Sequence, residues 1–258
     1  MVSHPCGRMA GISEEGVSVM IGKLKSVVLD ARDIDGLAAF YGELAGWSRT
    51  YADDEWITTV SDDGWRVCFQ LAPDHVPPRW PDPAHPQQAH LDLRVPELEA
   101  ATTRAVDLGA SLLRKNETWH TLADPAGHPF DLCLNADDPR TTLMGVMLDC
   151  PDAAALARFY AELLGKPVTY ESEGMAMIGD DGAQPLLFQQ VQRYRPPSWP
   201  DPIHPQQFHL DVEVDADGVD AAEAAALAIG ARRLPGEGAN WRVYADPADK
   251  PFCLVWTA

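Results

Sequence analysis

The chain has 258 residues, of which 46% are hydrophobic, and a formal net charge of −19 at pH 7. This excess of acidic residues argues against nucleic acid and against anionic membranes as partners, because both need clustered Lys and Arg. No hydrophobic run reaches the roughly 20 residues that span a membrane. Five cysteines without a CxxC spacing are typical of a reducing compartment, so we expect a cytoplasmic protein. Residues 1–20 lack the apolar core of a signal peptide and predict a flexible tail.

One long segment occurs twice. Residues 80–92 (WPDPAHPQQAHLD) return as residues 199–211 (WPDPIHPQQFHLD), an offset of 199 − 80 = 119. The same offset relates Phe40-Tyr41 to Phe159-Tyr160, while residues 123–130 (ADPAGHPF) return as 245–252 (ADPADKPF). A period of this length indicates tandem domains rather than a solenoid. We place the domains at residues 21–137 and 138–258.

The hydrophobic pattern of the first copy predicts two similar units. Residues 24–31 have the pattern of a strand, and the apolar spacing of 33–44 is typical of a helix that begins at Asp33 and ends before Gly46. Strands are expected at 47–51, 55–60 and 65–71. After the proline-rich residues 73–86, the second unit has a strand at 90–95, a helix at 97–108 and strands at 111–114, 118–123 and 130–134. The second copy repeats this order over 145–191 and 209–257, around the proline-rich residues 195–205. The predicted fold class is therefore α+β, with two βαβββ units per domain.

Strand alternation divides the side chains between two faces. Along residues 90–95, the leucines and Val95 lie on the face that the helix covers, whereas His90 and Asp92 lie on the other. By the same alternation, Ser26 and Asp30 point away from the helix. If the mixed sheet curls with its helices outside, this polar face lines a cavity.

Tandem βαβββ units with a Phe-Tyr pair in the first helix, a His-Leu-Asp strand start and an Ala-Asp-Pro-x-x-x-Pro-Phe ending resemble the vicinal oxygen chelate superfamily, in its glyoxalase-like branch. The resemblance covers nearly all of residues 21–258. It implies a cavity that binds a small molecule, since that superfamily contains glyoxalase I, extradiol dioxygenases, epimerases, thiol transferases that act on fosfomycin, and metal-free bleomycin-binding resistance proteins.

The resemblance also implies positions for metal ligands, on the cavity face of the first and last strands of each unit. In this chain those positions are occupied by Ser26, Gln70, His90 and Asp131 in domain one, and by Gly145, Gln189, His209 and Cys253 in domain two. No set of two histidines and one carboxylate can be assembled from them. Domain one retains Gln70, His90 and Asp131, which offer one nitrogen and two oxygens to a possible Zn, Ni, Fe or Mn ion. We expect no cofactor, because a tight site usually has three or four strong ligands.

Two His and carboxylate pairs are the candidate catalytic groups. They are His90 with Asp92 and His209 with Asp211, because an imidazole beside a carboxylate on a cavity face can transfer protons. The alternative to a catalytic role is a structural one, in which each histidine only anchors the proline-rich loop before it. Candidate ligand-binding residues share the cavity face or could form aromatic walls: Ser26, Asp30, Gln70, Trp119, Asp149, Gln189 and Trp241.

Two functions remain open at this point. The first is a glyoxalase-like lyase or isomerase that transfers a proton on a small carbonyl compound, with any metal polarising the substrate oxygen and stabilising an enediolate. The second is a metal-independent protein that sequesters an antibiotic or toxin. The sequence does not decide whether the chain is an enzyme. We expect a small-molecule ligand and a monomer or homodimer, and the pairing of the four units is also open.

Overall fold

The computed structural model describes residues 20–179 and 184–257. The predicted flexible tail, except for its last residue, lies outside the described residues. The first unit consists of β1 (Lys23–Ala31), α1 (Ile34–Ala45), β2 (Ser48–Ala52), β3 (Trp56–Val60) and β4 (Arg66–Leu71). The second consists of β5 (Ala89–Val95), α2 (Leu98–Asp107), β6 (Ser111–Lys115), β7 (Trp119–Ala123) and β8 (Pro129–Leu134).

The second copy repeats this order, as predicted. Its third unit consists of β9 (Thr142–Cys150), α3 (Ala153–Leu164), β10 (Val168–Ser172), β11 (Met175–Ile178) and β12 (Leu186–Gln190). The fourth consists of β13 (Phe208–Glu213), a short 3-10 helix (Ala216–Gly218), α4 (Val219–Ala228), β14 (Arg232–Glu237), β15 (Trp241–Ala245) and β16 (Pro251–Val255). The expected α+β class is confirmed.

Local capping explains where the first helix of each copy begins and ends. The Asp33 carboxylate accepts a hydrogen bond from the backbone nitrogen of Gly36, and Asp152 caps α3 in the same way. Each helix ends at a glycine in the left-handed region, Gly46 with φ 74° and Gly165 with φ 63°. A side chain in this conformation would be strained, so the two glycines end the helices at matching positions.

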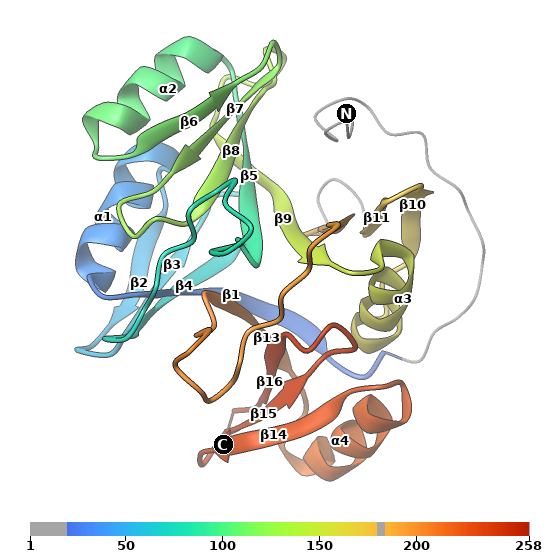
Figure 1. The fold of residues 1–258 in the computed structure, drawn as a ribbon. Coiled ribbons are helices and arrows are strands. Elements are labelled where there is room, and N and C mark those ends of the chain that lie inside the picture. The colour runs from blue at the N-terminus through green and yellow to red at the C-terminus, as the bar shows by residue number, and fades with distance from the viewer. Residues whose placement is uncertain (1–19, 180–183, 258) are drawn as a thin grey trace.

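The four units pair across the two copies. Among the described residues, β14-β15-β16-β13-β1-β4-β3-β2 form one eight-stranded sheet, which we call sheet A, and β10-β11-β12-β9-β5-β8-β7-β6 form the other, sheet B. Sheet A therefore joins the first and fourth units through antiparallel β1 and β13, and sheet B joins the second and third through antiparallel β5 and β9 (Figure 1). Neither sheet is closed.

The hydrophobic core connects the units that the sheets separate. Phe40 of α1 packs edge-on against Phe130 of β8 with ring centroids 5.8 Å apart, and Phe159 of α3 packs against Phe252 of β16 at 5.9 Å. The helix of one unit thus covers a strand of the other unit from the same copy. Interlocked aromatic contacts of this kind stabilise the arrangement beyond the area they bury.

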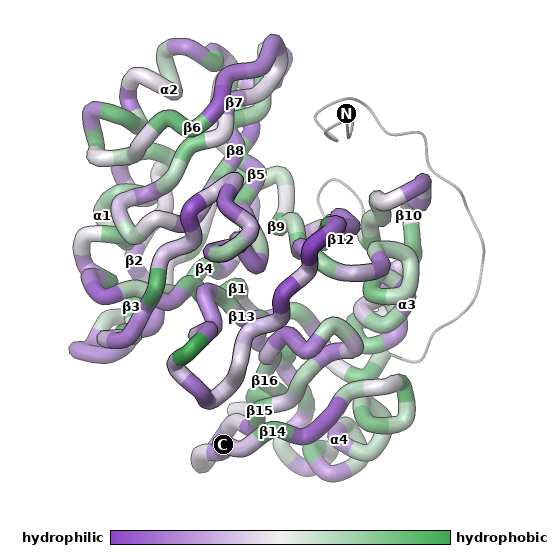
Figure 2. The backbone as a smooth tube through the Cα atoms, in the orientation of Figure 1, coloured by the Kyte–Doolittle hydropathy of each residue, from purple (hydrophilic) through white to green (hydrophobic). Residues whose placement is uncertain are grey.

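The predicted faces of the strands are confirmed. The main core cluster contains Val27 and Leu29 of β1 and Leu91, Leu93 and Val95 of β5. Figure 2 shows mostly hydrophobic residues at the centre of sheet A and a hydrophilic segment after β12. None of the helices in the described ranges is long and apolar enough to cross a membrane.

Candidate functional site

Sheet B brings three side chains of the second unit together on the face that points away from its helices. Asp92 of β5 lies directly across from Asp131 of β8, and His90 stands two residues before Asp92 on the same face. The His90 Nε2 atom is 3.5 Å from Asp92 Oδ1 and 3.9 Å from Asp131 Oδ2. All three are buried, with exposed fractions of 7%, 0% and 3% for His90, Asp92 and Asp131. We call these three residues the sheet B cluster.

Asp92 is the most unusual member of this cluster. Among the described residues, neither of its two buried carboxylate oxygens accepts a hydrogen bond of normal geometry, and the closest contact with His90 Nε2 is 3.5 Å long. A buried carboxylate without donors is costly unless a positive charge lies close to it. The residue across from it on β9 is Gly145, which has no side chain to donate a hydrogen bond. His90 is therefore the nearest source of compensation that the described geometry offers.

The charge on His90 depends on opposing effects. Burial alone lowers the pKa of this imidazole, but Asp92, Asp131 and Asp149 outweigh burial and raise it to about 9. Asp92 makes the largest contribution of the three carboxylates. The site therefore favours an imidazolium, and its positive charge compensates the carboxylates around it.

A glutamine from the repeated proline-rich segment orients this imidazole. Gln87 Nε2 lies 3.1 Å from His90 Nδ1 and donates to Asp149 Oδ1, also at 3.1 Å. Because the carboxylate demands a donor, the amide presents N–H to Nδ1, which places the proton of a neutral imidazole on Nε2, toward Asp92. A second proton on Nδ1 requires the amide of Gln87 to turn.

The same hydrogen bonds test whether the cluster fits a divalent cation. One nitrogen and two carboxylates are suitable donor types, and their ligand atoms lie within 4.8 Å of one another. A metal-bound histidine, however, offers the lone pair of one nitrogen and donates N–H from the other. Here the amide nitrogen of Gln87, a donor held by Asp149, faces Nδ1, so Nδ1 cannot donate N–H as it would in a metal-bound histidine unless the amide turns, and the set does not fit a cation as arranged.

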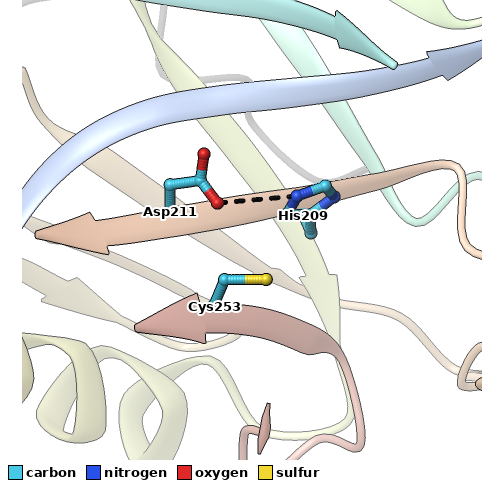
Figure 3. Close-up of side chains that lie close together, drawn as sticks. All are labelled: His209, Asp211 and Cys253. Atoms are coloured by element: carbon cyan, nitrogen blue, oxygen red, sulfur yellow. Dashed lines mark ion pairs between the residues drawn. The ribbon is translucent and has the colours of Figure 1, made fainter. Parts of the chain in front are cut away.

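Sheet A holds the equivalent cluster of the fourth unit, His209, Asp211 and Cys253, which we call the sheet A cluster. His209 and Asp211 project from β13 and Cys253 from β16, on one face of the sheet (Figure 3). His209 Nε2 is 3.6 Å from Asp211 Oδ1. Burial alone lowers the pKa of His209, but Asp211 and Cys253 raise it well above its usual value.

Two residues of the first unit complete this site from β1. Ser26 donates to Asp211 Oδ2 at 2.8 Å, so this carboxylate has the hydrogen bond that Asp92 lacks. Asp30 Oδ1 is 4.0 Å from His209 Nδ1, and Gln206 Nε2 donates to Asp30 Oδ2 at 3.0 Å while it lies 3.3 Å from His209 Nδ1. Burial raises the pKa of Asp30 to about 6, although His209 and Gln206 lower it. The Gln, His and Asp arrangement thus occurs in both sheets.

The expected grouping of Gln70 with His90 and Asp131 requires correction. Gln70 lies on β4 of sheet A, beside Asp30, whereas His90 and Asp131 lie in sheet B. The expectation assumed that the two units of one copy share a sheet. In the structure, the first-unit positions face the fourth unit instead, and Gln189 of β12 lies with the second unit, where it donates to Asp149 at 2.6 Å.

The aromatic candidates lie at the edges of the sites. Trp119 is half-buried at the start of β7, and Trp241 is 37% exposed at the start of β15 and packs over Gly238. By contrast, Trp199 of the proline-rich loop packs on the Leu234 cluster together with Cys253, and its indole nitrogen donates to the carbonyl of Pro235. Trp199 and Cys253 thus pack against the same hydrophobic residues of sheet A.

The sequence interpretation overlooked the two glutamines that orient the histidines. Gln87 and Gln206 belong to the repeated Pro-Gln-Gln segment, so their recurrence was the available signal. The role of each depends on a carboxylate about 62 or 176 residues away along the chain, Asp149 or Asp30. Such a contact is defined only by tertiary structure.

Comparison with known proteins identifies the fold. Glyoxalase I from Zea mays matches with a TM-score of 0.59 and 17% identity, over 90% of this chain and 92% of that chain. A putative dioxygenase from Bacillus subtilis matches with a TM-score of 0.63 and 10% identity, over 92% of this chain and 86% of that chain. At these identities the likeness shows the fold alone. No curated protein matches the chain.

The family is shown by the sequence itself. A model of the glyoxalase-like domain matches residues 26–133 and again residues 145–255. The two matches together cover most of the chain and coincide with its internal repeat. They also confirm the resemblance deduced from the motifs. The chain is a tandem member of the glyoxalase-like domain family.

Proposed function

We propose that the chain is a metal-independent enzyme that transfers a proton on a small enolizable carbonyl compound, within the cavities of its sheets. The single observation that carries this proposal is the repeated network in which a glutamine orients a buried histidine against a carboxylate. In both sheets the amide nitrogen faces Nδ1 and the acid faces Nε2. A network that only anchored a loop would not need a second acid beside the imidazole.

Sheet A offers the more complete set of roles. Asp30 has a pKa of about 6, because burial raises it, and this value suits a general base that works near neutral pH. The Nε2 hydrogen of His209 can bond to a carbonyl oxygen of the substrate and supply a proton as charge develops there. Asp30 takes a proton from the hydroxyl-bearing carbon next to that carbonyl and returns it to the former carbonyl carbon, while the imidazole of His209 regains its proton from the α-hydroxyl, so the net change is an isomerisation.

Sheet B offers the same imidazole and carboxylates in a site about as buried as that of sheet A, where His209, Asp211 and Asp30 are 5%, 6% and 4% exposed. Asp92 and Asp131 stabilise the imidazolium of His90. None of the three side chains is more than 7% exposed, so a substrate reaches them only after neighbouring side chains move. The second candidate function, for either sheet, is a binding site that encloses a small ligand without turnover.

Hydrogen exchange tests the proposal across a whole class of compounds rather than on one chosen substrate. A panel of α-hydroxy aldehydes and ketones is incubated in D2O with the protein and a chelator, and loss of the α-proton signal is followed by NMR. We expect exchange that falls at least about 100-fold in His209→Gln and Asp30→Asn, because general acid and base catalysis contributes that much. The matched variants His90→Gln and Asp149→Asn measure how much of the exchange takes place in sheet B.

Two results would contradict the proposal. Exchange that is unchanged in all four variants removes both networks from the chemistry. Exchange that requires added Zn2+, Ni2+, Fe2+ or Mn2+, together with stoichiometric metal in elemental analysis of the purified protein, contradicts metal independence. Circular dichroism of each variant shows whether it is folded.

A further inference from the structure

A pocket of about 220 Å³ lies between the two proline-rich loops, away from both clusters. The residues that line it form pairs related by the repeat offset of 119, such as His85 with His204 and Pro86 with Pro205. Equivalent residues of both copies meet only where an approximate two-fold axis relates the copies. The pocket therefore lies on the pseudo-two-fold axis of the molecule.

Two glutamines define this axis. The backbone nitrogen of Gln88 donates to Gln207 Oε1 at 3.1 Å, and the backbone nitrogen of Gln207 donates to Gln88 Oε1 at 2.9 Å. Each side-chain amide also donates to a proline carbonyl of the other copy, Pro205 at 2.9 Å and Pro86 at 3.1 Å. These reciprocal bonds hold the two loops in register, so the pocket between them is a built feature.

The lining departs from two-fold symmetry in its charge. Val76 of the first copy corresponds to Arg195 of the second, since 195 − 76 = 119. Arg195 forms no ion pair with any described carboxylate, and its one hydrogen bond within the described ranges is a long contact of 3.4 Å to the carbonyl of Ala84. In a chain with a net charge of −19, a guanidinium of this kind in a pocket is a local site for an anion.

The histidine pair adds hydrogen-bonding groups to the same pocket. His204 Nε2 is buried and has no hydrogen-bond partner in the described structure. His85 is oriented by Asp82, whose Oδ2 lies 3.2 Å from His85 Nδ1. The remaining walls are largely apolar and include four prolines and Ile203, which is 71% exposed. The site thus combines one cation and two imidazoles with an apolar surface.

We propose that this pocket binds a small organic monocarboxylate with an apolar body. Its carboxylate pairs with Arg195 and accepts a hydrogen bond from His204, while its apolar body packs on the prolines and Ile203. An anion is favoured over a metal ion because Arg195 repels a cation and the pocket offers only two imidazoles as strong ligands. The site is independent of the proton-transfer function, since none of its residues belongs to either cluster.

Isothermal titration calorimetry of the full chain with benzoate tests this proposal. Benzylamine, which has a similar shape and the opposite charge, is the matched ligand. Arg195→Val installs the residue of the equivalent position in the first copy, and Arg193→Val is the control with the same change in charge outside the pocket. We expect one benzoate per chain, at least about tenfold weaker binding in Arg195→Val, and less than twofold change in Arg193→Val.

Several outcomes would overturn the proposal. They are absence of benzoate binding, benzylamine that binds as tightly, or equal losses in the two arginine variants, which would indicate only long-range attraction. Zn2+ binding that is lost in His85→Ala, without benzoate binding, would replace the carboxylate with a metal. His209→Gln and His90→Gln should leave benzoate affinity unchanged, and a loss there would place the ligand in the sheets.

Discussion

The sheet faces that carry the two clusters share a plan but differ in polarity. On the first-unit half of sheet A, Thr58 and Cys68 contact each other, and Ser26 bonds to Asp211. On the equivalent third-unit half of sheet B, the side chains form a methionine-rich cluster. Its members are Met144, Met147, Met175 and Leu187, with Tyr170 and Met177 packed against them. Repetition therefore preserved the histidine and acid of each cluster and changed what surrounds them.

This difference shows how a neighbouring apolar residue alters a polar site. At position 145, a Cβ atom would collide with Leu187 Cδ1 and lie 3.0 Å from the Pro185 carbonyl oxygen. Because Leu187 fills this space, a side chain at position 145 fits only if Leu187 moves, and the glycine there leaves Asp92 without the donor that Ser26 provides to Asp211. Sheet B consequently depends on the charge of His90, whereas sheet A distributes the same task between a hydroxyl and an imidazole.

The largest expected effect concerns the charge of His90, on which sheet B depends. Asp92→Asn removes the strongest stabilisation of the His90 imidazolium, so the pKa of His90 falls from about 9 by roughly 2 units, equivalent to about 3 kcal/mol. NMR titration of the His90 ring protons measures the change. Asp149→Asn is the control, because Asp149 raises the pKa of His90 least among the three carboxylates. A His90 that still titrates near pH 9 would contradict this account.

The second prediction compares two residue pairs at equivalent positions in the two copies, each formed by the loop after the last strand of the copy's first unit and the turn before the last strand of its second unit. His75 and His128 pack together in the first copy, where Tyr194 and Lys250 form a cation-π contact in the second. Burial lowers the pKa of His75 and of His128 to about 4 from 6.5. The folded state resists their protonation, so each contributes stability above pH 6.5 that is lost as the pH falls toward 4.

Urea unfolding at pH 7 and pH 5 measures this loss, which we expect to be about 2 kcal/mol for each histidine. His75→Tyr, which installs the residue of the second copy, should reduce the loss by that amount. Tyr194→Phe serves as the control and should leave the pH dependence as in the unmodified chain. Equal pH dependence in all three proteins would show that these histidines do not limit acid stability.

The third prediction tests the collision between Leu187 and a side chain at position 145 in sheet B. Gly145→Ser should lower the free energy of unfolding by about 1–3 kcal/mol, because added volume in a packed interior displaces its neighbours. Leu187→Cys installs the residue found at Cys68 in sheet A and should restore part of this loss when combined with Gly145→Ser. Urea unfolding of the single and double variants measures both effects. Purely additive losses would indicate that Leu187 is not the obstacle.

The smallest effect is expected in sheet A. Ser26→Gly removes the hydroxyl that donates to Asp211 and should cost about 1–2 kcal/mol, since a buried carboxylate loses a donor. Ser48→Gly on β2, an exposed strand serine, corrects for the backbone effect of glycine. Unfolding free energies of the two variants give the difference. Equal losses of unfolding free energy would show that the Ser26 hydroxyl contributes no stability beyond the backbone effect of glycine.

Much of the fold was predictable because its determinants are local. Asp33 and Gly46 marked the first helix, since capping depends on residues within one turn. Strand alternation correctly separated Leu91 and Leu93 from His90 and Asp92. The grouping of Gln70 with His90 was wrong, because alternation assigns a face to a residue and does not identify the strand that lies beside it.

The sequence by itself determined the tandem repeat, the βαβββ units and the histidine and acid that each cluster contains. Only the tertiary structure decided that the first unit pairs with the fourth and the second with the third, because either pairing buries the same strand faces. It also decided which glutamine meets which carboxylate, and that the two loops form a shared pocket. These are contacts between segments far apart in the chain, whose local patterns are compatible with more than one arrangement.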